Sequence, residues 1–343
     1  MKMISRRNFL KATAVVAGAA ALTACGNDAP AGGNGDAGNA GAGDGAKKVG
    51  VSIYKFDDNF MTTYRIALEE ILKARGYEVT IVDGNNDQAK QTEQINTFIT
   101  QGMNALIINP VMPSAASSTV SLVAGADMPT VFINREPTAE DMAGFNKLVY
   151  VGCDAAQSGT MQGQLILDTA NRGDINGDGT VSYIMIQGDP ENIDAQLRTE
   201  YSVKALEDAG MKVEKLNLTR GDWDQNKGQE IAANDLSQFG DKIEVVFCNN
   251  DSMAMGAMQA IQAAGRTVGT DIYLVGVDAL PEALTAIQEG TLTGTVLNDA
   301  KGQAEMAVTC MEELLGGKTY AEGEQSVYVD YVPVSAANVA EFM

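Results

Sequence analysis

Residues 48–82 read KVGVSIYKFDDNFMTTYRIALEEILKARGYEVTIV and contain one complete strand–helix–strand unit. Its two ends, Lys48–Tyr54 and Glu78–Val82, are short and rich in Val and Ile, which is typical of parallel strands buried on both faces. Between them, Asn59–Arg75 has apolar residues at helical spacing, and Gly76 follows as a helix stop. This stretch therefore predicts an α/β fold.

The same alternation continues along the rest of the chain. Further strands are expected at Ala105–Asn109, Thr130–Asn134, Val181–Ile186, Val213–Leu218, Ile243–Cys248, Ile272–Val277 and Gly294–Leu297, with helices at Gln88–Gln101, Gln157–Asn171, Asp194–Ala209, Ser252–Ala264 and Leu280–Gln288. Alternation over about 280 residues predicts doubly wound parallel sheets with helices on both faces. Because this is too much chain for one small sheet, we expect two α/β domains.

The charge and the missing residue types narrow the classes of function. The 343 residues include 45 acidic and 24 basic side chains, a formal net charge of −21, which repels phosphates and predicts no nucleic acid partner. There is no histidine, which is the commonest general base and the usual catalytic zinc ligand, and there is neither a G-x-S-x-G nor a Walker A sequence. The sequence favours a binding protein and not an enzyme, with a glycosidase that uses paired carboxylates as the alternative.

The first 46 residues have the composition of an export signal followed by a flexible tether. Residues 1–24 combine a basic start, an apolar run and a small-residue exit, which are the parts of a signal peptide. Cys25 follows the residues LTA as in a bacterial lipobox, which predicts a lipid anchor on Cys25 and a location outside the cytoplasm, at the cell membrane. The run SRRNFLK, residues 5–11, is similar to a twin-arginine signal, and a basic start used by the general pathway is the alternative. Residues 25–46, almost only Gly, Ala, Asn and Asp, predict a lipid-anchored flexible tether.

Polar and aromatic side chains follow several of the expected strands. They are Asp57, Asp58 and Phe60, then Asn109, Asn249–Asp251, Asp278, and Asn298 with Asp299. In open α/β sheets ligands bind beyond the carboxyl ends of the strands, and Asp and Asn groups beside an aromatic face suit the hydroxyls and C–H faces of a sugar. Each acidic residue alone is equally well explained as a helix cap. Repetition of the pattern at several strand ends favours a ligand site.

Six runs resemble the galactose/glucose-binding proteins of bacterial sugar ABC transporters. They are Tyr54–Met61, Ile243–Val246, Asn249–Asp251, Met253–Ala257, Gly276–Leu284 and Gly294–Ala300, and the resemblance extends from about Lys48 to Phe342. It implies the type I periplasmic-binding-protein fold, with two doubly wound parallel-sheet domains joined by three hinge crossovers. The expected lobes are residues 47–128 plus 299–328 and residues 129–298 plus 329–343.

The resemblance also implies a function. The expected protein is a monomeric extracytoplasmic receptor that closes on D-galactose or D-glucose and delivers it to the membrane subunits of an ABC transporter. A chemoreceptor is a further partner that could read the closed form. The alternative is a receptor of the same fold for ribose, xylose or a modified sugar.

Residues that match the family's sugar site are assigned by position. The resemblance implies that Phe60 and Trp223 stack on the two faces of the ring and that Asp58 accepts from a hydroxyl. The remaining hydrogen-bonding residues would be Asn109, Asp194, Arg198, Asn250, Asp278 and Asn298. Asn192 stands where the family usually has histidine, so it belongs to the expected site but is predicted to alter the preference among hexoses. The pair Phe60 and Trp223 favours a pyranose.

Residues 174–182, DINGDGTVS, have the oxygen spacing of an EF-hand-type calcium loop. The twelfth place is Met185, so a complete EF-hand is excluded. The resemblance implies that Glu244 supplies the missing carboxylate and that the loop holds a structural Ca²⁺. The expected ligands are Asp174, Asn176, Asp178, Thr180, Ser182 and Glu244, with Ser182 binding directly or through water. A solvated acidic turn is the alternative.

Overall fold

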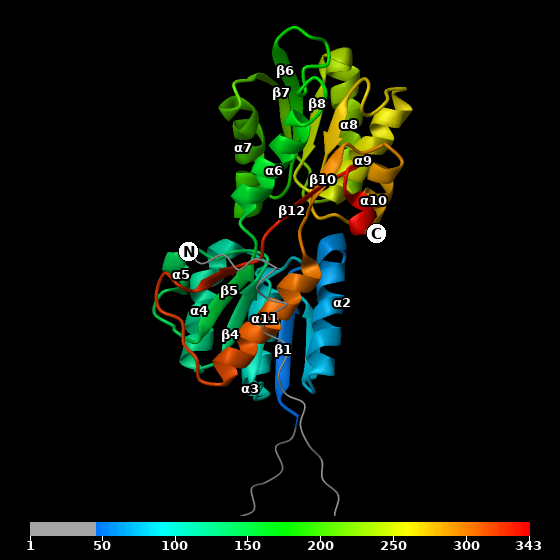
Figure 1. Cartoon of the computed structure of the whole chain (residues 1–343). Coiled ribbons are helices and arrows are strands. Elements are labelled where there is room, and N and C mark those ends of the chain that lie inside the picture. The colour runs from blue at the N-terminus through cyan, green and yellow to red at the C-terminus, as the bar shows by residue number, and fades with distance from the viewer. Residues whose placement is uncertain (1–45) are drawn as a thin grey trace, which may run out of the picture.

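The structure is a computed structural model that describes residues 46–343, so the predicted signal, Cys25 and nearly all of the tether lie outside the described residues. Two lobes follow each other along the long axis of the molecule (Figure 1), and each contains one six-stranded sheet. None of the helices in residues 46–343 is long and apolar enough to cross a membrane. The predicted pair of α/β domains is confirmed.

The first sheet has the strand order β11-β5-β4-β3-β1-β2, and all of its pairs are parallel. Its strands are β1 (Lys48–Ile53), β2 (Glu78–Asp83), β3 (Ala105–Ile108), β4 (Thr130–Ile133), β5 (Leu148–Gly152) and β11 (Ser326–Tyr328). The helices of this lobe are α2 (Asn59–Ala74), α3 (Gln88–Thr100), α4 (Ala116–Gly125), α5 (Ala139–Met142) and α11 (Ala300–Leu315), with a 3-10 turn at Pro113–Ala115.

The second sheet has the order β12-β10-β9-β8-β6-β7, in which only the edge strand β12 pairs antiparallel. Its strands are β6 (Thr180–Gln187), β7 (Lys212–Arg220), β8 (Val245–Cys248), β9 (Tyr273–Val275), β10 (Gly294–Leu297) and β12 (Val332–Ser335). Its helices are α6 (Ala155–Leu167), α7 (Ile193–Asp208), α8 (Gln225–Phe239), α9 (Asp251–Ala263) and α10 (Pro281–Gln288), with 3-10 turns at Gly240–Lys242 and Val339–Glu341.

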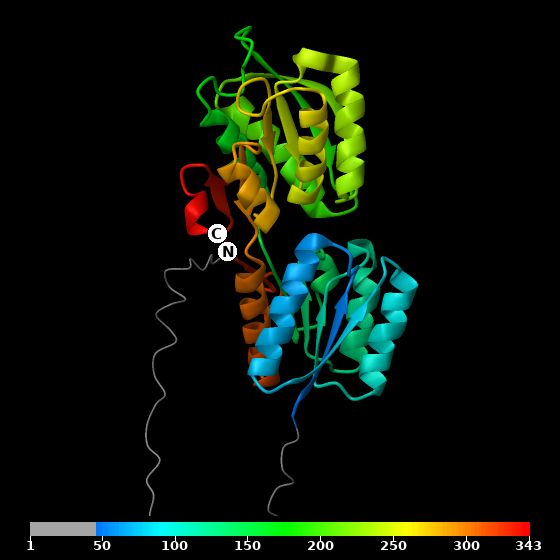
Figure 2. The same cartoon turned by 90° about the vertical axis from the view of Figure 1, so that its right-hand side faces the viewer.

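Helices cover both faces of each sheet, so the central strands are buried on both sides. Every residue of β3, β4, β5 and β8 is buried, as continuous apolar runs in parallel sheets require. Helices α2 and α11 form one layer on the first sheet, and α3 lies on the opposite face, as Figure 2 shows. On the second sheet, α8, α9 and α10 pack on one face and α6 with α7 on the other.

Three crossovers join the lobes, as predicted, but one predicted boundary is wrong. The chain crosses between β5 and α6, between β10 and α11, and between β11 and β12. The expected division at residue 129 placed β4 and β5 in the second lobe. They belong to the first sheet, because Leu106 of β3 pairs with Thr130 of β4, and Thr130 pairs with Leu148 of β5. An apolar run predicts a strand but carries no signal for which sheet edge it joins, so the first lobe extends to Gly152.

Candidate functional site

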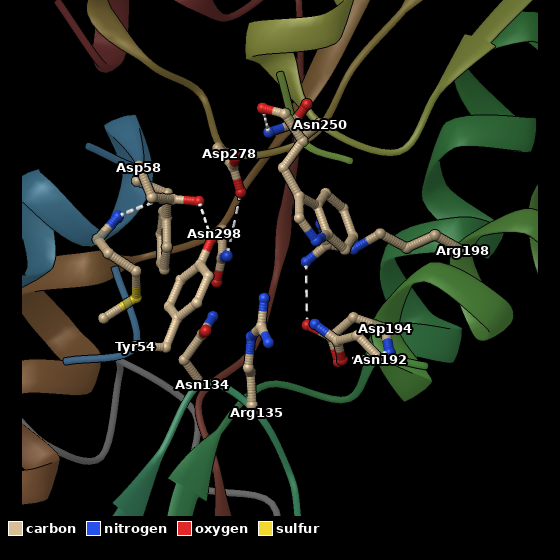
Figure 3. Close-up of a pocket in the computed structure, with 13 residues that line it drawn as sticks. Tyr54, Asp58, Asn134, Arg135, Asn192, Asp194, Arg198, Asn250, Asp278 and Asn298 are labelled. Carbon is tan, nitrogen blue, oxygen red and sulfur yellow. Dashed lines mark hydrogen bonds and ion pairs between the residues drawn. The ribbon is translucent and has the colours of Figure 1, made fainter. Parts of the chain in front are cut away.

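A cavity lies between the two lobes, lined by residues that follow the carboxyl ends of strands in both sheets (Figure 3). The volume of this cavity is about 30 Å³. Its walls are Tyr54, Asp58, Phe60, Met61, Asn134 and Arg135 from the first lobe, Asn192, Asp194, Arg198, Trp223, Asn250 and Asp278 from the second, and Asn298 from a crossover. Nine of the ten residues predicted to bind a sugar line this cavity. Residues distant in the sequence meet here because parallel strands end at one edge of a sheet.

Three of the wall residues cap helices and line the cavity at the same time. The Oδ1 atom of Asp58 accepts from the N–H of Met61 at 2.7 Å and so begins α2, while Oδ2 accepts from the Tyr54 hydroxyl at 2.6 Å. Asn250 caps α9 and Asn192 caps α7 in the same manner. For the acidic Asp58 the sequence left open whether the residue is a helix cap or a ligand residue. The structure shows that all three residues are caps and also line the cavity, where a cap fixes the side chain at the cleft edge and leaves further polar capacity free.

Arg198 and Asp194 form a buried ion pair on the cavity wall. The guanidinium of Arg198, 3% exposed, donates from Nη2 to Asp194 Oδ2 at 3.4 Å and to the Tyr331 hydroxyl at 2.9 Å. Its Nη1 atom donates to the carbonyl of Asn249 at 2.9 Å, and Nε has no partner within the described chain. Burial raises the pKa of the Asp194 carboxyl, and the charge of Arg198 opposes that rise. Both side chains of the pair line the cavity, and the Nε–H donor of Arg198 has no hydrogen-bond partner within residues 46–343.

Asp278 is a second buried carboxylate of the site, and the β10–α11 crossover holds it. Asn298 Nδ2 donates to Asp278 Oδ1 at 3.1 Å, and Asn298 Oδ1 accepts from Gln303 of α11 at 2.6 Å. Burial raises the pKa of Asp278 to about 7, against the lowering effects of Arg198 and of the Asn298 hydrogen bond. A carboxyl that titrates near neutrality can accept from a ligand hydroxyl when ionised and donate to one when protonated.

Left-handed backbone conformations gather around the cavity. Asn134, Trp223 and Asp278 line it with φ values of 62°, 63° and 124°, and Asp222 and Ala279 are adjacent residues with φ of 52° and 54°. Such conformations are uncommon for residues other than glycine. They persist where the surrounding structure holds the residue in place, and they fix the direction of its side chain. Trp223 thus lines the cavity from the β7–α8 loop of the second lobe, and Phe60 lines it from α2 of the first.

The sequence prediction missed Tyr54, Met61, Asn134 and Arg135. Arg135 is 2% exposed, donates from Nη1 to the Val111 carbonyl at 2.6 Å, and stacks on the Tyr54 ring at 3.7 Å. Asn134 and Arg135 stand at and directly after the end of the expected strand at 130–134. The rule applied to the other strand ends would therefore have found them.

Asn109, in contrast, is not among the residues that line the cavity, and its predicted contact with the ligand stays a prediction. It is fully buried, and its Nδ2 donates to the Ile133 carbonyl at 3.2 Å and to Asn134 Oδ1 at 3.1 Å. Its Oδ1 accepts from the N–H of Tyr54 at 3.2 Å. Asn109 lies behind the wall and holds Tyr54 and Asn134 in place, because its amide can join neighbouring strand ends.

The predicted calcium loop lies at the start of β6, at the opposite end of this strand from the cavity. Glu244, 1% exposed, does reach the loop: Oε1 accepts from the N–H of Asn176 at 2.9 Å and Oε2 from that of Ser182 at 2.8 Å. Asp174 accepts from the N–H groups of Gly177 and Gly179. Within residues 46–343, no three acidic, His or Cys side chains gather closely enough to hold a metal ion.

The fold and the cavity define a two-lobed binding protein that encloses a small polar ligand. Residues 49–319 match the periplasmic binding protein domain family, and residues 3–23 match the twin-arginine translocation signal sequence. The chain therefore belongs to the periplasmic binding protein domain family and carries a signal for export from the cytoplasm.

Individual relatives bear this assignment out. The chain is 36% identical to the D-galactose/methyl-galactoside binding periplasmic protein of Haemophilus influenzae, over 86% of this chain and 92% of the relative. It is 29% identical to a ribose import binding protein of Bacillus subtilis, over 79% and 82%. The structure of an ABC transporter solute binding protein from Bacillus halodurans C-125 with bound myo-inositol matches with a TM-score of 0.75 and 30% identity, over 88% and 99%.

Proposed function

We propose that this chain is an extracytoplasmic receptor that encloses D-galactose or D-glucose between its lobes and presents it to the membrane subunits of an ABC transporter. The observation that carries the proposal is the cavity itself, in which Phe60 and Trp223 face a space surrounded by Asp, Asn and Arg groups. The likeness to the Haemophilus influenzae galactoside binder supports a hexose.

The wall chemistry suits a hydroxylated ring. The carboxylates of Asp58, Asp194 and Asp278 accept from sugar hydroxyls, while Arg198 and the amide groups donate to their oxygens and to the ring oxygen. The aromatic side chains cover the C–H faces of the ring. Because ligand groups bind residues of both lobes, the ligand favours the closed form by its differential affinity. The closed form is the state that the transporter would recognise, and no bond of the ligand is made or broken.

Calorimetric titration of the body, residues 47–343, with D-galactose, D-glucose, D-ribose, D-xylose and myo-inositol tests the ligand. We expect one-to-one binding of a hexose that weakens at least about tenfold in Trp223→Ala and Asp58→Ala. Asn96→Ala, on the outer surface of α3, is the control and should bind as the wild type does. The relative affinities for galactose and glucose give the preference of the wild-type protein. The variant Asn192→His carries the side chain that is usual in the family, so the same titrations of this variant show what Asn192 does to the preference.

A cyclitol is the second candidate, because a structural neighbour at 30% identity holds myo-inositol. A cyclitol has the same hydroxyl-rich ring but neither a ring oxygen nor an exocyclic carbon. Binding of myo-inositol without a hexose would keep the receptor and replace its ligand. Binding of ribose alone would do the same in favour of the pentose alternative.

The cellular setting of the receptor is part of the proposal. We propose that Cys25 is lipidated after removal of residues 1–24, that the tether holds the body at the membrane, and that the body is a monomer that a chemoreceptor can also read. Cys25→Ala should release the protein from the membrane fraction. Light scattering of the wild-type body should give the mass of one chain, and a dimer would contradict the proposal.

We further propose a structural Ca²⁺ held by Asp174, Asn176, Asp178, Thr180, Ser182 and Glu244. The support is the oxygen spacing of the loop and the placement of the buried Glu244 carboxylate against it. Binding of the ion to the folded state alone should raise the unfolding temperature, so EDTA should lower it and added Ca²⁺ restore it. Glu244→Gln should abolish the response. A wild-type protein that is insensitive to EDTA and Ca²⁺ would leave the loop as a solvated turn.

A further inference from the structure

Gly188 lies directly after β6, and the indole ring of Trp223 rests on it. A Cβ atom built on Gly188 would lie 2.5 Å from Cε2 of Trp223 and closer still to Cζ2 and Cη2 of the same ring. Non-bonded carbon atoms do not approach each other so closely, so any side chain at position 188 must displace the Trp223 ring.

Backbone geometry does not explain the glycine. Its φ angle lies outside the left-handed region, so an L-residue could adopt it without strain. Its N–H donates to Asn249 Oδ1 at 3.0 Å, a bond that alanine would keep. The contacts of this residue therefore leave the Trp223 ring as the reason for the missing side chain.

The backbone of Trp223 has little freedom to move away. Asp222 and Trp223 both have positive φ, and Asn250 Nδ2 donates to the Trp223 carbonyl at 3.4 Å. Asp222 is paired with Arg220 and with Lys227. A new side chain at residue 188 would therefore act mainly on the ring torsions and not on the loop.

Trp223 lines two cavities. The inner cavity is the ligand site, and an outer cavity of about 330 Å³ adjoins it and is lined by residues of both lobes. Trp223, Tyr54 and Arg135 line both cavities. A shift of the Trp223 ring therefore changes the wall of both cavities, including the aromatic surface of the inner one.

We propose that Gly188 is a positioning residue for ligand recognition: its bare backbone sets the plane of Trp223 and so the height of the inner cavity. The inference deepens the proposed function and rests on it.

Trp223 is the single tryptophan of the chain, so intrinsic fluorescence reports on this position alone. The test uses the exported protein with Gly188→Ala, Trp223→Phe and the double variant. Emission is recorded where Trp223 is present, and the affinity for D-galactose is measured in all variants by isothermal titration calorimetry. Gly125→Ala is the control, because a Cβ there meets nothing within 4 Å and its φ is also ordinary. Gly188→Ala should shift the ligand-free emission and weaken D-galactose binding by about tenfold or more, since overpacking displaces the ring.

In the Trp223→Phe background the same glycine change should alter the affinity by less than about threefold, because the smaller ring lacks the atoms that meet Cβ. Equal losses in both backgrounds, or unchanged emission and affinity in Gly188→Ala, would overturn the proposal. If Gly188→Ala fails to fold, recovery of folding in the double variant supports the contact and continued failure overturns it. If the wild-type protein does not bind D-galactose, the proposed ligand is wrong. The shift in ligand-free emission of Gly188→Ala, compared with Gly125→Ala, still tests the contact between Gly188 and Trp223.

Discussion

Arg135 brings a second guanidinium to the cavity from the first lobe. Figure 3 shows it extending into the space between Tyr54 and Asp194. Stacking on the Tyr54 ring and one hydrogen bond to the Val111 carbonyl hold its plane, and both use the flat, delocalised shape of the group. Its position on the wall allows the remaining N–H groups to donate to a ligand.

Arg135→Lys should weaken D-galactose binding by about tenfold while the unfolding temperature changes little, because an ammonium keeps the charge but loses the stacked plane and the fixed donors. Isothermal titration calorimetry measures the affinity. Arg75→Lys is the control, because Arg75 pairs with Glu305 and Glu312 outside the cavity. Equal affinities of Arg135→Lys and wild type would remove Arg135 from the ligand site.

Asp278 connects the site to pH. Its pKa rises from 3.8 to about 7 in the folded protein because burial disfavours the charged form. Between those values the folded state binds a proton that the unfolded state has released. The free energy of unfolding therefore falls as pH rises through this window, and the contribution is constant above and below it.

Asp278→Asn should remove this fall, since an amide has nearly the shape of the protonated carboxyl and does not titrate. In the ligand-free protein the variant should be more stable than wild type at about pH 8, and the difference should shrink towards about pH 5. Thermal unfolding across this range measures the difference. A difference that is independent of pH would show that Asp278 titrates normally in the folded protein.

At the scale of elements, the close pairing of α8 with α9 supports the Trp223 and Asn250 ends of the cleft. Gly256 of α9 lies against the backbone of α8: a Cβ there would be 2.6 Å from the N atom of Gln229 and would overlap the Gln225 carbonyl oxygen. Backbone atoms cannot turn aside as a side chain can, so the two helices would have to separate.

Gly256→Ala should lower the free energy of unfolding by about 1–3 kcal/mol in spite of the better helix propensity of alanine. Gly125→Ala, at the end of α4 and in open space, should be neutral or stabilising by up to about 1 kcal/mol. Urea denaturation of both variants measures the two values. If the free energy of unfolding of Gly256→Ala is unchanged or increased, as expected for Gly125→Ala, the contact between the two helices at Gly256 relaxes without cost.

For the whole molecule, the structure is a closed form. The polar wall residues Asn192, Asp194, Arg198, Asn250, Asp278 and Asn298 are all buried. A ligand as large as a sugar can therefore reach the cavity only when the lobes separate. Asn59 at the start of α2 donates to the Ser252 hydroxyl of α9 at 3.0 Å, and this bond joins the two lobes directly.

Asn59→Ala should weaken ligand binding by about twofold to tenfold, since it removes one hydrogen bond of the closed form without touching the cavity. The loss should lie in a faster release of ligand, which stopped-flow fluorescence of Trp223 measures. Asn96→Ala, which loses only a bond within α3, is the matched control. An unchanged release rate would show that the Asn59 bond does not contribute to closure.

Much of the fold and the cavity was predictable because the signals are local. The apolar runs predicted β1, β3, β4, β6 and β8 with small shifts of their ends, and nine predicted ligand residues line one cavity. The division of the lobes was less predictable, since the strand at 130–133 reads the same whichever sheet it joins. Arg135 was missed although it directly follows the expected strand at 130–134, a position at which the strand-end pattern places ligand residues.

The alternation of strands and helices, the polar strand ends and the export signal can be read from the residues alone, because each depends on neighbouring residues and on the periodicity of one element. Three features become visible only in the folded chain: β4 and β5 complete the first sheet, Asn109 supports the wall instead of forming it, and Trp223 rests on Gly188. These features depend on which hydrogen-bonding edges and which surfaces meet in space, and residues far apart in the chain make those contacts.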